Sequence, residues 1–147
     1  MKSISLILGA CIIFSLNSCG QDFKKLNDSE TDKKKVLIAQ NFASDFFTKL
    51  KKGEEYHFQD EAIDALKTQF TAETQKSVYQ QLKTQFGDFQ SLEYAETWIQ
   101  NNSKSIGIFR FKGEFDKSAK KLEIRVVLNE SDKIAGFWIK PWSDMLQ

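Results

Sequence analysis

Apolar residues recur at helical spacing after the first 34 positions and predict a long helix. Ile38, Phe42, Phe46 and Leu50 follow one another at four-residue intervals, which places them on one helical face. Lysines gather in the last turn of this segment, where they complement the carbonyl end of a helix. Gly53 follows at the position that commonly ends a helix. We therefore expect an amphipathic helix with one buried face.

Two more helices are predicted before the pattern changes. A weaker helical pattern covers 58–70. Thr71 is a suitable N-cap for a third helix, with Glu73 in the first turn and Gly87 as its stop. Between these ends, apolar residues again recur every four positions.

Beyond the third helix the apolar period becomes two, and β-branched and aromatic residues dominate. Four strands are predicted, over 88–100, 105–115, 121–129 and 133–140. In the first strand Leu92, Tyr94 and Trp98 alternate, although Glu96 interrupts them. Short polar connections favour an antiparallel meander, and Pro141 ends its last strand.

These elements predict the α+β class, with three N-terminal helices packed on one face of a curled four-stranded antiparallel meander. In the second strand Phe109 and Phe111 share one face. The charged positions on the opposite face are typical of a solvated sheet: Arg110, Lys112, Glu123 and Arg125.

The chain begins with the pattern of an export signal. Lys2 precedes an apolar run over 4–14 that is too short to span a bilayer as a helix. The sequence Leu16-Asn17-Ser18-Cys19 then resembles the lipobox of bacterial lipoproteins, whose signal is cleaved before a cysteine that becomes lipidated. We expect a signal peptide over 1–18, a lipidated Cys19 with a flexible charged tether over 19–35, and one α+β domain over 36–147.

Charge and cysteine content narrow the function classes. Cleavage would remove 18 of 147 residues and leave 129, enough for one domain with a core. Without Lys2, 20 basic residues face 20 acidic ones, so charge gives no case for a nucleic-acid partner. Cys11 lies in the signal and Cys19 would be acylated. The folded part would then lack a disulfide, a thiolate nucleophile and a cysteine metal site.

The order of elements resembles a bacterial family of unknown function. That family comprises small exported or lipid-anchored domains related to the cone-shaped nuclear transport factor two-like and cystatin-like fold. The residues that carry the resemblance are Phe42, Leu50, Thr71, Phe86, Gly87, Phe89, the run 133–136 and Pro141. The resemblance implies this fold and envelope location, and it brings no catalytic residues.

Catalytic and metal-binding chemistry has one weak candidate. If a helix starts near His57, then Glu61 and Asp64 follow on the same face and could hold a divalent cation or form an acid/base pair. The alternative is a solvated helix face with polar pairs. No Gly-x-Ser-x-Gly elbow or phosphate-binding glycine loop is present. The sequence therefore predicts no cofactor and disfavours an enzyme.

Aromatic residues of the predicted sheet are the better candidates for a ligand or partner surface. The set is Tyr94, Trp98, Phe109, Phe111, Trp138 and Trp142. In a cone-shaped fold the concave sheet face and the helices enclose a pocket, which aromatic side chains would suit. Plain core packing is the competing interpretation, especially for the Phe residues. Trp138 would face outward if its neighbours Phe137 and Ile139 face the helices.

Three functional hypotheses follow. The leading one is a non-enzymatic module, held at the membrane by the lipid on Cys19, that binds a small apolar ligand or an envelope protein. The second is a small enzyme that uses His57, and the third is an accessory or immunity-type partner of a neighbouring envelope protein. Because Gly20 rather than Asp follows Cys19, the outer membrane facing the periplasm is favoured in a cell with two membranes.

Overall fold

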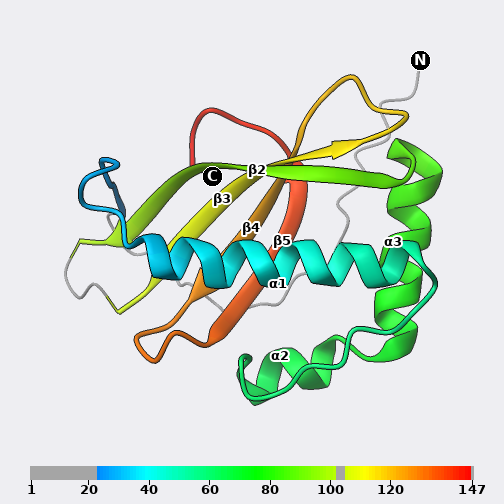
Figure 1. The fold of residues 1–147 in the computed structure, drawn as a ribbon, viewed down its shortest axis with the longest axis horizontal. Coiled ribbons are helices and arrows are strands. Elements are labelled where there is room, and N and C mark those ends of the chain that lie inside the picture. The colour runs from blue at the N-terminus through cyan, green and yellow to red at the C-terminus, as the bar shows by residue number, and fades with distance from the viewer. Residues whose placement is uncertain (1–22, 102–104, 147) are drawn as a thin grey trace.

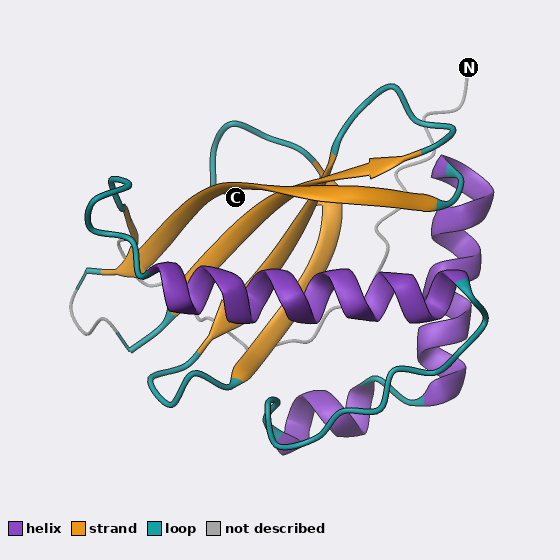
Figure 2. Cartoon of the chain, in the orientation of Figure 1, coloured by secondary structure: helices purple, strands orange, loops and turns teal. Residues whose placement is uncertain are grey.

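The computed structural model describes residues 23–101 and 105–146 and shows an α+β fold. Within these residues three helices and five strands follow one another (Figure 1). Their bounds are β1 Phe23–Lys25, α1 Lys33–Lys51, α2 Asp64–Gln69, α3 Ala72–Phe86, β2 Phe89–Gln100, β3 Gly107–Phe115, β4 Leu122–Leu128 and β5 Ile134–Pro141. The strands form one antiparallel sheet in the order β1-β2-β3-β4-β5. Figure 2 shows α1 running across one face of the sheet, with α3 across the C-terminal end of α1.

The first helix forms as its sequence pattern predicts. The Asp32 carboxylate caps its start by accepting the backbone N–H groups of Lys34 and Lys35 at 2.9 and 3.4 Å. Gly53 follows the C-cap residue with a φ of +78°, a conformation that favours glycine. None of the helices in the described ranges is both long and apolar enough to cross a membrane.

A phenylalanine-rich core joins α1 to the inner face of the sheet. Phe137 of β5 lies with its ring centroid 5.1 Å from those of both Phe42 and Phe46. Phe47 stacks on Phe89 of β2 at 4.9 Å. These rings are almost completely buried and pack mostly edge to face, which suits their quadrupoles. The predicted inward faces of α1 and of the last strand are confirmed.

The sheet has five strands, so the expectation of four is wrong. β1 lies within the segment expected to be a flexible tether and pairs with β2, Phe23 opposite Gln100 and Lys25 opposite Trp98. The backbone N–H of Leu26 then donates to the Thr97 carbonyl at 2.9 Å. Three residues are too few to display a period of two, so this strand has no sequence signature.

The second helix is shorter than the predicted 58–70 and begins only at Asp64. The residues before it are bound to the edge of the sheet instead. The backbone N–H of Ile134 donates to the Glu61 carbonyl at 2.7 Å, and that of Ile63 donates to the Ile134 carbonyl at 3.0 Å. Backbone groups used in this way cannot also form a helical ladder.

A bulge in β2 changes which face its later residues occupy. Tyr94 lies opposite Phe111 and Glu96 lies opposite Arg110, so β2 has one extra residue, Ala95, between these pairs. The predicted alternation of Leu92, Tyr94 and Trp98 along one face is therefore wrong. Beyond the bulge, Glu96 and Trp98 lie on the face opposite α1.

Candidate functional site

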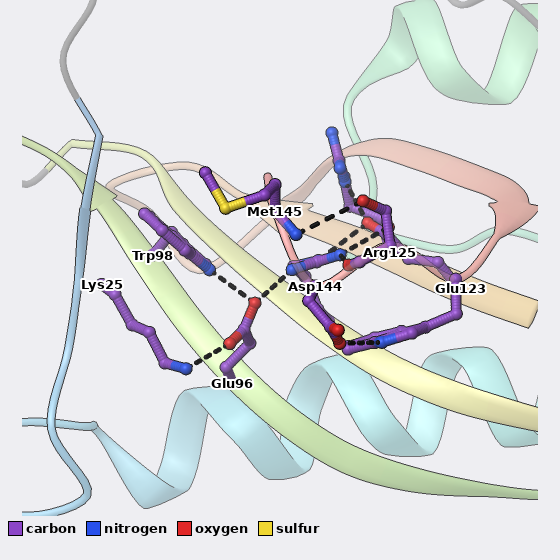
Figure 3. A network of polar contacts seen from close by, with 10 residues as sticks. Lys25, Glu96, Trp98, Glu123, Arg125, Asp144 and Met145 are labelled. Carbon is purple, nitrogen blue, oxygen red and sulfur yellow. Dashed lines mark hydrogen bonds and ion pairs between the residues drawn. The ribbon is translucent and has the colours of Figure 1, made fainter. Parts of the chain in front are cut away.

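The sheet face opposite α1, here called the outer face, carries a layer of buried charge (Figure 3). Strand register places Glu96, Arg110 and Arg125 side by side on β2, β3 and β4. Arg110 and Glu123 are 0% exposed and Glu96 is 8% exposed. The expectation of an ordinary solvated face is therefore wrong here. Strand alternation reports which face a residue occupies, and it does not report what covers that face.

The Arg110 guanidinium organises this cluster. Its Nε and Nη2 donate to the two carboxylate oxygens of Glu123 at 3.0 and 2.8 Å, a two-pronged ion pair. Nη1 donates to Glu96, and Nη2 also donates to the Ser143 carbonyl at 2.5 Å. Arg125 Nε donates to Glu123 at 2.6 Å. Two arginines and two carboxylates thus neutralise one another within the sheet.

The surroundings keep both carboxylates ionised. Burial alone would raise the pKa of Glu123, but the hydrogen bonds and charges of Arg110 and Arg125 outweigh burial and lower that pKa. Burial likewise opposes ionisation of Glu96, and the hydrogen bonds it accepts, that from Lys25 first, lower its pKa. The pKa of Arg110 is raised, because its carboxylate partners outweigh its burial.

Two distant segments of the chain complete the cluster. From β1, Lys25 Nζ lies 2.5 Å from Glu96, which also accepts a hydrogen bond from Trp98 Nε1 at 2.9 Å. From the C-terminal segment, the Trp142 ring lies over Arg110, whose Cζ is 4.4 Å from the ring centroid. The outer face is therefore held together by residues from both ends of the described chain.

The six aromatic candidates do not form one surface. Trp98, Trp138 and Trp142 are half-buried on or beside the outer face. A Cβ added at Gly136 would meet the Trp138 ring at 2.2 Å, so this indole lies directly over the glycine. The sequence-based expectation that Trp138 faces away from the helices agrees with its register opposite Arg125.

The other three candidates belong to the inner face. Phe111 is 0% exposed and is a core residue, so it is wrong as a surface candidate. The Tyr94 hydroxyl shares a 2.8 Å hydrogen bond with Thr97, and its ring lies 5.9 Å from that of Phe111. Phe109 is 2% exposed, and it borders a hollow at one end of the sheet.

This hollow of about 470 Å³ lies between the start of α1, the turn after β1, and the ends of β2 and β3. Leu26, Ile99 and Phe109 supply its apolar surface, and Lys24 and Lys35 are among the charged residues that also line it. Here it is called the β1 hollow. Sequence reasoning missed Leu26 because it lies in the segment expected to be a tether.

Two further hollows are also lined by both apolar and charged residues. One of about 530 Å³ lies between the end of α1 and α3 and is lined by residues that include Lys51, Glu54 and Lys83. The other, of about 420 Å³, is a groove on the outer face beside Glu96 and Trp142. An aromatic residue is among the lining residues of all three: Phe109 in the β1 hollow, Tyr79 between α1 and α3, and Tyr94 in the outer-face groove.

The predicted His57, Glu61 and Asp64 constellation is not assembled, because all three precede or begin α2. His57 is 71% exposed, and its Nδ1 lies 3.9 Å from Glu55. Glu61 instead accepts the Tyr56 hydroxyl at 3.1 Å, and the Asp64 side chain is 99% exposed. Among the described residues no group of three His, Cys, Asp or Glu side chains could hold a metal ion.

We predict that Glu123→Gln destabilises the fold by about 3 kcal/mol at pH 7, because it leaves the Arg110 charge buried with a neutral partner. The folded-state pKa of Glu123 is lowered from its ordinary 4.5, so its ionic contribution is full above that pH. It is lost as the pH falls through the folded-state value. Urea unfolding from pH 7 to pH 3 should show the gap between wild type and variant narrowing below about pH 4.5.

Glu93→Gln is the matched control, since Glu93 is exposed on the same face, and it should change stability by no more than about 0.5 kcal/mol. A gap between wild type and Glu123→Gln that stays constant with pH would contradict the ionised, buried pair.

Comparison with known proteins adds no relative. No protein-family model, no curated protein and no solved structure matches the chain.

Proposed function

We propose that this chain is a lipid-anchored binding module of the bacterial cell envelope that takes a small apolar ligand in the β1 hollow. Its anchor is the lipid on Cys19, within the lipobox sequence 16–19. The observation that carries the proposal is the hollow itself. An apolar surface of Leu26, Ile99 and Phe109 lies beside β1, the strand that follows the anchor along the chain.

The architecture supports a cone of the nuclear transport factor two-like and cystatin-like type. In such a cone a helix closes the concave face of an antiparallel sheet and leaves a pocket at one end. Here α1 packs against β2, β3 and β4, and the β1 hollow lies where α1 begins. We assign the cone on this arrangement and on the sequence resemblance.

The size and chemistry of the hollow suit a small amphipathic molecule. Its volume of about 470 Å³ falls in the range of ligand pockets, roughly 300–1,000 Å³. The apolar side chains give the ligand a dry surface, and charged residues at the edge, such as Lys24 and Lys35, can meet a polar end. An apolar surface with polar groups beside it is typical of small-molecule sites.

The outer face is less suited to binding, because most polar groups of its buried cluster already have partners, although Arg125 Nη2 is buried without one. Four of the five N–H groups of the Arg110 guanidinium donate to Glu96, Glu123 or the Ser143 carbonyl. A ligand there would have to displace both this ion pair and the C-terminal segment that covers it.

The expected cellular location is the outer membrane, facing the periplasm, in a bacterium with two membranes. The balanced charge of the mature chain gives no strong electrostatic attachment, so lipid must hold it there. Two or more acyl chains hold a protein stably, whereas one holds it only marginally.

A charge placed in the β1 hollow should weaken ligand binding. We predict that Leu26→Glu weakens binding of the fluorescent apolar probe N-phenylnaphthylamine about tenfold or more, because an ionised carboxylate is costly in an apolar site. Leu37→Glu is the matched control, since Leu37 is 56% exposed on α1 and lines none of the three hollows. The measurement is a fluorescence titration. No saturable binding to wild type, or equal binding by both variants, would refute a ligand site here.

The anchor has its own test in the producing bacterium. Feeding cells an alkyne fatty-acid analogue should label the mature protein, and Cys19→Ala should abolish the label and leave an unprocessed, longer chain. A processed wild-type protein that carries no label would rule out lipidation at Cys19.

A further inference from the structure

The β1 hollow lies very close to the proposed anchor, and this inference rests on that anchor. Only three residues, 20–22, separate Cys19 from Phe23, the first residue of β1. A fully extended chain spans at most about 3.6 Å per residue, so the Cα atoms of Cys19 and Phe23 lie within about 14 Å. Lys24, the next residue of β1, already lines the hollow. The domain cannot be held far from the membrane, and this end of it must lie nearest.

The same end carries lysines that helix stability does not explain. Lys33, Lys34 and Lys35 occupy the first turn of α1, which contains no acidic residue. Positive charge at a helix N-terminus opposes the helix dipole. Lys33 and Lys34 are exposed, and Lys35, which lines the hollow, pairs with Asp132 at 2.8 Å. A negatively charged surface at this end would offset that unfavourable arrangement.

Two acidic residues at the hollow, Glu30 and Asp32, do not cancel the attraction of these lysines for a negatively charged surface. Lys24 pairs with Glu30 at 3.2 Å, but both side chains are about half exposed, and such surface pairs are weak. Asp32, whose carboxylate caps α1, keeps its negative charge, but the three lysines that follow it outnumber that charge. A phosphate group could therefore compete for Lys24 and meet Lys33 and Lys34 directly.

We infer that the β1 hollow accepts one acyl chain of an anionic phospholipid from the membrane that holds the anchor. Leu26, Ile99 and Phe109 would contact the chain, and the lysines at the start of α1 would contact the phosphate. The lipids attached to Cys19 are a different occupant, because they have to remain in the bilayer to anchor the domain.

Photocrosslinking in vesicles tests this inference. Full-length mature lipoprotein is reconstituted into vesicles of phosphatidylethanolamine and phosphatidylglycerol that contain phosphatidylglycerol with a photoreactive acyl chain. Crosslinked peptides are then mapped by mass spectrometry. We expect crosslinks concentrated around Leu26, Ile99 and Phe109.

Variants separate the acyl site from the lysine contact. Leu26→Glu and the hollow-filling Leu26→Trp should each reduce crosslinking about tenfold, whereas Leu37→Glu should not change it. Lys33→Glu with Lys34→Glu should reduce it about tenfold for phosphatidylglycerol and little for a phosphatidylcholine probe. Because Leu26→Trp adds no charge and Leu26 is only half-buried, it guards against a result that reflects unfolding.

Three outcomes would overturn the inference. They are crosslinks centred on the outer face, equal crosslinking by the Leu26 and Leu37 variants, and crosslinking to the protein's own Cys19 lipid alone. If N-phenylnaphthylamine binding still depends on Leu26 in any of these cases, the proposed function stands and only the phospholipid assignment fails. Loss of both signals would reject the two together.

Discussion

The buried ion pair between Arg110 and Glu123 is the interaction on which the outer half of this fold depends. Removing two charges from water is costly, and only close, two-pronged geometry with further hydrogen bonds offsets that cost. Here the pair joins β3 to β4, Glu96 extends it to β2, and the Ser143 carbonyl joins it to the C-terminal segment. One guanidinium thus fixes three strands and the end of the described chain.

This arrangement gives the two faces of the sheet different roles. The outer face uses most of its buried polar groups on one another, and Trp142 of the C-terminal segment lies over Arg110, so the face offers few free donors or acceptors. The inner face is filled by phenylalanine rings along α1, and the β1 hollow opens at the end where α1 begins and β1 joins the sheet. The open end is also the end nearest the proposed anchor. The proposed anchor and the proposed ligand site therefore lie at the same end of the domain.

Sequence periodicity predicted most of the helices and strands, but it did not predict the β1 hollow or the buried ion pairs of the outer face. The Thr71 cap, the phenylalanine face of α1 and the four long strands all follow from local patterns that tertiary contacts reinforce. β1 is too short to carry a pattern, and the Ala95 bulge moves Trp98 to the other face with only the interrupting Glu96 as a sequence signal. The burial of Arg110 depends on a segment 33 residues away, which alternation within β3 cannot report.

Amide chemical-shift mapping of the whole domain, with N-phenylnaphthylamine added stepwise, tests most directly whether the ligand binds in the β1 hollow and not on the outer face. We expect saturable shifts that cluster at Leu26, Ile99 and Phe109, with the indole N–H signals of Trp98 and Trp142 unmoved. Shifts centred on those two indoles, with the residues of the β1 hollow unchanged, would contradict that expectation.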